Sequence, residues 1–247
     1  RVVFAIPYEG AFTLIGTTDV PWDLQPEQVS IAPEEIEYLC ETVNRYSRKR
    51  VSPADVQWSY AGVRPLVDDE SADASSVTRD YRLQLDAAGA PLLSVFGGKL
   101  TTYRKLAEAA LAKLQPYIGG SRRNWTHTAA LPGGDFPGAD FLAFLRDVKR
   151  RWTFLSDALA LRLARSYGTE MERIVGSATQ MGELGASFGA GLTAAEIDYL
   201  IAFEWAETAE DILWRRTKLG LHMTSQECGA LTRYLSASRL TATASTS

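Results

Sequence analysis

The chain has 247 residues, enough to bury a sizeable core in one large domain or two smaller ones. Hydrophobic residues make up 46% and charged residues 23%, which excludes a disordered, collagen-like or disulfide-scaffold chain. The net charge of −4 gives no basic surplus, and phosphate neutralisation supplies most of the affinity of nucleic-acid binders. We therefore expect no nucleic-acid partner, with only a local basic patch left open.

The first part of the chain, up to residue 118, is predicted to combine antiparallel strands with helices. Runs of β-branched and aromatic residues between turn residues indicate the strands, and apolar stripes at helical spacing indicate the helices. The expected elements are strands at 2–6 and 12–16, a helix from 33 to about 49, a strand at 56–60, a hairpin of 81–85 with 92–96, and a helix from about 100 to 114. A strand, a glycine turn and a helix follow one another at the end of this part.

The composition changes after residue 118. Residues 119–138 are rich in glycine and proline, which indicates a linker. Strand patterns then stop, and we expect an all-α domain over 139–240 and a frayed tail over 241–247. Its helices are expected at 141–150, 156–167, 170–178, 194–205, 210–219 and 225–235, and the glycines between 182 and 191 are expected to lie in a loop. The predicted fold class is therefore α+β, followed by an all-α carboxy-terminal domain.

Cysteine and histidine usage gives little support to metal or disulfide chemistry. Cys40 and Cys228 lie far apart in patterns typical of helices, which favours reduced thiols. With His127 and His222 they form no cluster with the ligand spacing of a zinc site, so no metal is expected. No apolar run approaches the roughly 20 residues that span a bilayer, and no signal peptide is visible.

Gly97 and Gly98 separate an apolar strand from a predicted helix, and Lys99 follows them. Two glycines let the backbone pass close to a ligand, and the start of a helix offers free N–H groups and the positive end of the helix dipole. Such a turn suits an anionic group, either a phosphate or the pyrimidine edge of a reduced flavin. A tight turn that binds nothing is the alternative that these residues alone leave open.

Two arginines are candidates for binding an anion. Arg64 lies between glycine and proline in GVRP (62–65), where a rigid backbone presents a planar fork that suits a carboxylate or phosphate. The alternative is a structural ion pair with the acidic residues at 68–70. Arg79 lies in TRDY (78–81), where a local pair with Asp80 is the alternative.

The order of the motifs is more specific than any single motif. They are GTTD (16–19), GVRP (62–65), TRDY (78–81), VFGGKLTTYRK (95–105), LPGG (131–134) and EDILWRRTKLG (210–220). In this order the chain resembles the carboxy-terminal portion of the aerobic, quinone-linked, FAD-dependent glycerol-3-phosphate dehydrogenases. These enzymes are a branch of the D-amino-acid-oxidase-like flavoproteins, and the resemblance extends over nearly the whole chain.

The resemblance implies a flavoenzyme that oxidises glycerol 3-phosphate to dihydroxyacetone phosphate and passes the electrons through FAD to membrane quinone. It implies a peripheral protein at the cytoplasmic face of the membrane. The substrate contacts that it implies are Arg64, Arg79 and Lys99, and the flavin contacts are Gly62, Arg64, Gly97, Gly98, Lys99, Leu100 and Thr101. Two arginines suit a doubly charged phosphomonoester, and a cation at a helix start stabilises negative charge on flavin N1 and O2.

Two parts of such an enzyme are missing from the sequence. No GxGxxG motif occurs, so no phosphate-binding loop serves the ADP half of FAD. The general base that the resemblance implies is a histidine upstream of this chain, so no catalytic residue is assigned, and neither His127 nor His222 inherits that role. The chain begins in a strand pattern without an initiator Met. We therefore expect an inactive fragment that retains little or no flavin.

Other interpretations stay open at this stage. The helical domain could act as a self-standing interaction module, or the parent could be another D-amino-acid-oxidase-like flavin oxidoreductase. The basic, aromatic segment 141–154 could touch a membrane surface, although such a pattern is more often a helix with its apolar face in the core. The segment 210–235 could pass for a helix-turn-helix, but its basic residues have nearby acidic partners. A homodimer also stays open.

Overall fold

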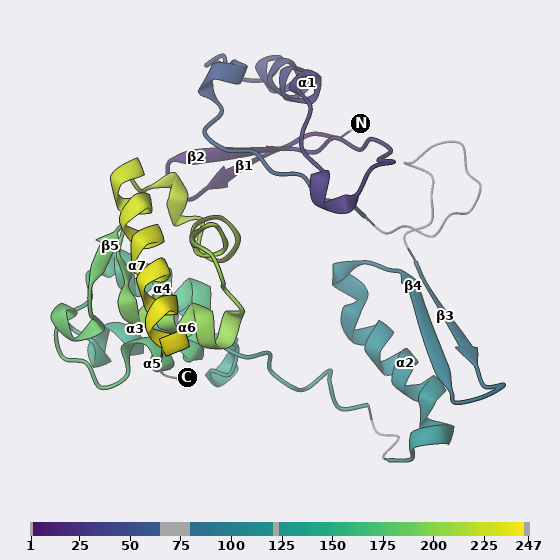
Figure 1. Cartoon of the computed structure of the whole chain (residues 1–247). Coiled ribbons are helices and arrows are strands. Elements are labelled where there is room, and N and C mark those ends of the chain that lie inside the picture. The colour runs from purple at the N-terminus through teal and green to yellow at the C-terminus, as the bar shows by residue number, and fades with distance from the viewer. Residues whose placement is uncertain (1, 65–79, 121–123, 245–247) are drawn as a thin grey trace. The chain divides into compact units, whose positions relative to one another are not determined.

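The computed structural model of the chain describes residues 2–64, 80–120 and 124–244. The chain forms two compact units, Arg1–Thr128 and Ala129–Ser247, which are called unit 1 and unit 2 below (Figure 1). The expected fold class is confirmed, because unit 1 combines antiparallel hairpins with helices and unit 2 is mainly helical. The expected boundaries at 118, 138 and 240 stay predictions. Within the described residues no helix is long and apolar enough to span a membrane, and no acidic, His or Cys cluster could hold a metal ion.

Unit 1 begins with an antiparallel hairpin of β1 (Phe4–Tyr8) and β2 (Phe12–Gly16). Both expected strands are present, and β1 lies two residues later than expected because Pro7 and Tyr8 pair with β2. The chain reverses at Glu9 and Gly10, which both have a positive φ. Gly16 ends β2, so the motif GTTD forms the exit from the hairpin.

Helix α1 (Pro33–Asn44) begins where expected but ends five residues before position 49. The Asn44 side chain accepts a hydrogen bond from the Val51 N–H and donates one to the Val51 carbonyl, both at 2.8 Å, and so closes a loop after the helix. The strand expected at 56–60 is not formed; a short 3-10 turn (Pro53–Asp55) leads into irregular backbone. A strand needs a neighbour for its backbone hydrogen bonds, and none of the described residues pairs with this segment.

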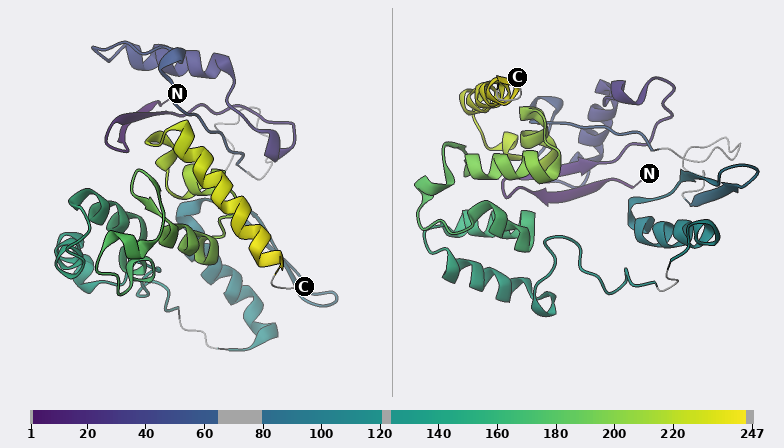
Figure 2. Two further views of the ribbon diagram at one scale, coloured as in Figure 1. Left: turned by 60° about the vertical axis from the view of Figure 1, so that its left-hand side comes forward. Right: turned by 60° about the horizontal axis from the view of Figure 1, so that its bottom comes forward.

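The second hairpin of unit 1 confirms the expected one and leads into a helix. β3 (Tyr81–Asp86) pairs with β4 (Leu92–Gly97), and alternate residues of β3 are half-buried because they face α2 (Tyr103–Ile118) (Figures 1 and 2). A single 3-10 turn, Leu100–Thr102, joins β4 to α2, in agreement with the helix expected from residue 100. On α2, the Glu108 carboxylate accepts hydrogen bonds from Arg104 and Thr126, which fastens the segment after residue 123 to the helix.

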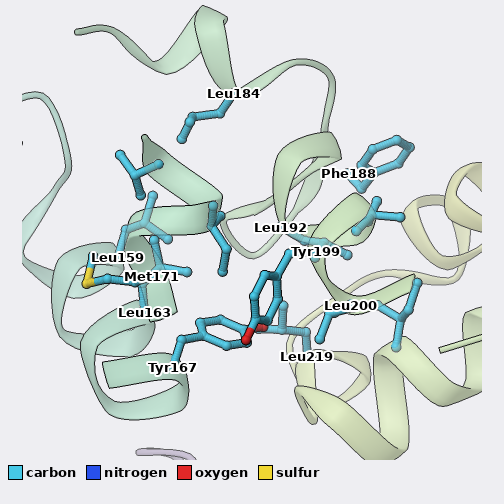
Figure 3. Close-up of a cluster of buried hydrophobic side chains, with 14 of the residues drawn as sticks. Leu159, Leu163, Tyr167, Met171, Leu184, Phe188, Leu192, Tyr199, Leu200 and Leu219 are labelled. Carbon is cyan, nitrogen blue, oxygen red and sulfur yellow. The ribbon is translucent and has the colours of Figure 1, made fainter. Parts of the chain in front are cut away.

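Unit 2 encloses a hydrophobic core between α3 (Phe141–Arg151), α4 (Asp157–Tyr167), α5 (Met171–Val175), α6 (Ala194–Glu204) and α7 (Ser225–Ala244). Leu163, Met171 and Leu200 are at most 2% exposed, and Tyr167 meets Tyr199 edge to face with ring centroids 5.3 Å apart (Figure 3). Each fully buried side chain of this size is worth about 1.5–3 kcal/mol. Figure 2 shows α7 crossing unit 2, and the helix packs against β5 (Ser187–Gly189).

Three details of unit 2 differ from the expectation. The glycine-rich segment expected as a loop contains a short hairpin of β5 and β6 (Leu192–Thr193), because glycines with positive φ turn the chain between them. The helix expected at 210–219 is a π-helix, Asp211–Arg216, in which the Thr217 N–H donates to the Ile212 carbonyl at 3.1 Å. Helix α7 continues to Ala244, so residues 241–244 are helical where a frayed tail was expected.

The motif LPGG (131–134) docks against the end of α4. The Thr169 N–H donates to the Gly133 carbonyl at 3.0 Å, and Gly133 and Gly168 both have a positive φ. A methyl group on either glycine would collide with the backbone of the other segment. Both glycines are therefore required by the close approach of two backbones. A pocket of about 350 Å³ beside this contact is lined by Phe136, Phe141 and Arg165 among others.

A buried ion pair connects α4 to α6. Glu196, which is 1% exposed, accepts hydrogen bonds from Arg162 Nη1 at 2.6 Å, Arg162 Nη2 at 2.7 Å and the Tyr167 hydroxyl at 2.6 Å. Arg162 also donates to the Gly191 carbonyl at 3.0 Å, in the β5–β6 turn. Burial and the neighbouring Glu196 raise the pKa of Tyr167, so its hydroxyl stays a donor at neutral pH. One network therefore fixes two helices and a hairpin.

The first prediction concerns this network. Glu196→Ala leaves the largely buried Arg162 guanidinium without its counter-charge. We expect the free energy of unfolding of unit 2 to fall by about 3–5 kcal/mol. Asp198→Ala, on an exposed position of the same helix, is the matched control and should change stability by less than about 0.5 kcal/mol. Thermal unfolding followed by circular dichroism measures both. Equal losses in the two variants would contradict the role given to Glu196.

Candidate functional site

The glycine turn between β4 and α2 is built by two residues with positive φ. Gly97 has φ +67° and Gly98 has φ +103°, conformations that residues with a side chain rarely adopt. A Cβ on Gly98 would lie 3.3 Å from Leu106 Cδ1 and 3.4 Å from Tyr81 Cβ, a tight fit against both neighbouring elements. The turn therefore needs glycine for backbone shape and for close packing.

The residues after the glycines form the first turn of the helix. The Thr102 hydroxyl donates to the Lys99 carbonyl at 2.9 Å, and the Lys99 N–H donates to the Thr102 hydroxyl at 3.3 Å. The N–H groups of Leu100 and Thr101 have no partner among the described residues, as expected at a helix start. Lys99, Leu100 and Thr101 are exposed, and the Leu100 side chain is 89% exposed. Free N–H groups, a helix dipole and a lysine make this turn attractive to an anion.

Arg64 forms an ion pair with Asp19, its Nη2 lying 3.1 Å from Asp19 Oδ2. The pair joins GVRP to GTTD, 45 residues apart, and leaves the arginine side chain 44% and the aspartate side chain 32% exposed. The acidic residues at 68–70, the partners considered from the sequence, lie outside the described residues. Gly62 has no positive φ and open space where a Cβ would lie, so local packing does not require glycine there.

The described residues gather the candidate positions into two groups. The first group is contiguous in the glycine turn and consists of Gly97, Gly98, Lys99, Leu100 and Thr101. The second consists of Arg64, which pairs with Asp19, and Gly62, two residues before it in the chain. No contact joins Arg64 to Lys99 within the described part of the chain. Arg79 lies outside the described residues. The substrate and flavin roles of all these residues stay predictions.

Sequence reasoning did not select Asp19 as a site residue, although its motif was noted. The sequence feature that could have suggested Asp19 is its place in GTTD, three residues after Gly16, where strand β2 ends. Nothing in the sequence identifies Arg64 as its partner, because the pairing depends on how the irregular segment 56–64 returns to the hairpin β1–β2.

In unit 2 the motif RRTKLG mainly stabilises its own fold. Arg215 pairs with Glu210 and Asp211, both at 2.8 Å, which confirms the expected acidic partners of this basic residue. The Lys218 ammonium donates to the Trp214 carbonyl, and the Trp214 ring covers Gly220 so closely that a Cβ there would collide with it. Although burial opposes it, hydrogen bonds from Thr208 and Glu207 lower the pKa of Asp211 to about 2. These contacts give every basic residue of the motif except Arg216 a local role.

Helix α3 turns its aromatic residues inward. Phe144 stacks on Phe136 with ring centroids 4.9 Å apart and contacts Phe141, and the helix is followed by Trp152, which is 5% exposed. Arg151 pairs with Glu172 and lies over the Trp152 ring. The arrangement matches a surface helix with its apolar face in the core, the interpretation favoured for this segment from its sequence. His127 and His222 are both exposed.

Two family models match this chain, one in each unit. Residues 1–104 match the family of FAD-dependent oxidoreductases, and residues 124–237 match the C-terminal domain of alpha-glycerophosphate oxidase. The chain therefore combines an FAD-dependent oxidoreductase domain over residues 1–104 with a domain similar to the C-terminal domain of alpha-glycerophosphate oxidase over residues 124–237. The second match covers most of unit 2. The family expected from the motifs is thereby confirmed.

Curated relatives of this chain carry closely related names. A glycerol-3-phosphate dehydrogenase of Pseudomonas aeruginosa is 48% identical over 95% of this chain and 46% of its own length. An aerobic glycerol-3-phosphate dehydrogenase of Escherichia coli is 46% identical over 95% of this chain and 47% of its own. A D-erythritol 1-phosphate dehydrogenase of Brucella abortus is 44% identical over 98% of this chain and 48% of its own. The chain spans about half the length of the relatives it matches.

The second prediction concerns the glycine turn. Gly98→Ala forces a methyl group into a left-handed backbone and against Leu106, and we expect a local cost of about 1–3 kcal/mol. Hydrogen exchange of the β4 and α2 amides should then accelerate by about 5- to 150-fold. Gly89→Ala in the β3–β4 turn is the control, since a Cβ there meets open space without a positive φ. Unchanged exchange in Gly98→Ala would show that the turn does not need its glycine.

Proposed function

We propose that this chain is the carboxy-terminal part of an FAD-dependent enzyme that oxidises sn-glycerol 3-phosphate to dihydroxyacetone phosphate. The observation that carries the proposal is the glycine turn, whose helix start attracts anions. By the resemblance of its motif VFGGKLTTYRK, this turn corresponds to the one beneath the flavin ring in the family. The names of the relatives from Pseudomonas aeruginosa and Escherichia coli support the substrate.

The residues of the glycine turn fit a flavin. When bound, FAD supplies the acceptor for the hydride that leaves the substrate carbon. Gly97 and Gly98 would let the backbone approach the ring because they carry no side chains, and the free N–H groups of Leu100 and Thr101 would stabilise negative charge on it. Lys99 adds a formal positive charge at the same helix start. The exposed Leu100 side chain offers an apolar surface to the ring.

The phosphate of the substrate is proposed to bind Arg64, Arg79 and Lys99. A phosphomonoester carries close to two negative charges at neutral pH, which two arginines and a lysine can balance. Arg64 pairs with Asp19 through one Nη atom, and a guanidinium carries five N–H donors, so one fork can hold an aspartate and a phosphate together. Arg64 also matches a flavin-contacting position, together with Gly62.

The remaining parts of the proposal concern the whole enzyme. The ADP half of FAD would be held by a segment that this chain lacks, because no GxGxxG occurs in it, so the chain alone would be inactive and retain little flavin. The electrons would pass to membrane quinone from a peripheral enzyme at the cytoplasmic face. These last features rest on the family resemblance.

The third prediction tests the substrate. In the full-length protein, Arg64→Ala should lower kcat/KM for glycerol 3-phosphate by about 10- to 150-fold, which corresponds to about 1.5–3 kcal/mol for a lost charge-assisted contact. Arg82→Ala, at an exposed position of β3, is the control and should leave the kinetics unchanged. Steady-state assays with a dye acceptor measure both.

D-erythritol 1-phosphate is included as a competing substrate in these assays, because one relative carries that name. A preference for it over glycerol 3-phosphate would contradict the proposed substrate. Equal kinetics of Arg64→Ala and the unaltered enzyme would contradict the phosphate contact.

A further inference from the structure

We propose that Asp19 is a positioning residue that orients the Arg64 guanidinium toward the anionic substrate. This inference rests on the proposed function and extends it to a residue outside the expected site. It starts from the 3.1 Å contact between Asp19 Oδ2 and Arg64 Nη2, which brings together two motifs that are separate in the sequence.

Arg64 lies at the end of residues 56–64, an irregular segment in which Trp58 stacks on Tyr60 with ring centroids 5.0 Å apart. Residues 56–64 form no strand, so no ladder of backbone hydrogen bonds fixes the direction of the arginine. Two residues earlier, Gly62 leaves open space where a side chain would stand. Among the described residues Asp19 is the one ion-pair partner of Arg64. Asp19, which follows strand β2, therefore connects Arg64 to the hairpin β1–β2.

The geometry of a guanidinium allows it to bind two anions at once. Arginine carries five N–H donors in a rigid planar fork, and Asp19 occupies one Nη atom. When Asp19 contacts one edge of the guanidinium, the remaining N–H groups of Arg64 point in a fixed direction. The arginine side chain then loses less conformational freedom when a phosphate binds. The pair is too exposed to add much to folding stability, because exposed ion pairs are screened by water and salt. Its effect should therefore appear in substrate binding.

The opposing effect is repulsion between the Asp19 carboxylate and a phosphate dianion. Two features limit it: the aspartate side chain is 32% exposed and therefore screened, and it contacts one edge of the fork. Preorganisation and repulsion act on KM in opposite directions. If removal of the Asp19 charge raises KM, preorganisation is the larger effect; if it lowers KM, repulsion is the larger effect.

The fourth prediction is a double-mutant cycle in the full-length enzyme, with Asp19→Asn, Arg64→Gln, the double variant and the unaltered protein. Asp19→Asn keeps the size of the side chain and should raise KM for glycerol 3-phosphate about 3- to 10-fold, with kcat within about 2-fold. Asp19→Glu, which keeps the charge, should recover part of that loss. In the Arg64→Gln background, Asp19→Asn should have no further effect. Glu41→Gln removes an exposed charge from α1 and is the control.

The outcomes separate this inference from the function on which it rests. If the unaltered enzyme oxidises glycerol 3-phosphate but Asp19→Asn leaves KM unchanged or lowers it, the positioning role is wrong and the function stands. If Asp19→Asn still raises KM in the Arg64→Gln background, Asp19 acts independently of Arg64, and the inference is also wrong. If the unaltered enzyme does not oxidise glycerol 3-phosphate, the proposed function itself fails.

Discussion

The left-handed backbone at Gly97 and Gly98 is the constraint on which the candidate site depends. It allows β4 to end and α2 to begin within a few residues, with Leu106 and Tyr81 packed against the turn. As a consequence, Lys99 lies beside the N–H groups of Leu100 and Thr101 at the exposed start of the helix, and these N–H groups have no partner among the described residues. An anion or the electron-rich edge of a reduced cofactor would find its counter-charge already in place.

The two units differ in how completely their apolar side chains are buried. Unit 2 holds the continuous core, with Arg162, Glu196 and Tyr167 as a satisfied polar network inside it. In unit 1 the buried apolar residues within the described segments are Leu39 and Cys40, each 7% exposed. Leu100 and Phe4 instead remain 89% and 55% exposed. This contrast assigns most of the hydrophobic stabilisation of the described residues to unit 2.

Local sequence patterns predicted much of the fold, because the elements that were predicted correctly are determined by residues close together in the sequence. The β3–β4 hairpin follows from alternation around Ala88 and Gly89, and the start of α1 follows from Pro33 and the acidic residues after it. The failures have non-local causes. The end of α1 depends on Asn44 reaching Val51, and the missing strand at 56–60 depends on a neighbour that sequence pattern cannot supply. The tight turn at Gly97 and Gly98 could be predicted from the two glycines. The pairing of Asp19 with Arg64 could not, because it joins residues that come together only in the folded structure.

The proposed function requires that the glycine turn bind a flavin and that glycerol 3-phosphate reduce this flavin. The most direct measurement is anaerobic mixing of the full-length, flavin-loaded protein with glycerol 3-phosphate while absorbance near 450 nm is recorded. We expect bleaching of the flavin band, with dihydroxyacetone phosphate formed in equal amount to the flavin reduced. A flavin band that persists with glycerol 3-phosphate, but is bleached by dithionite, would contradict it.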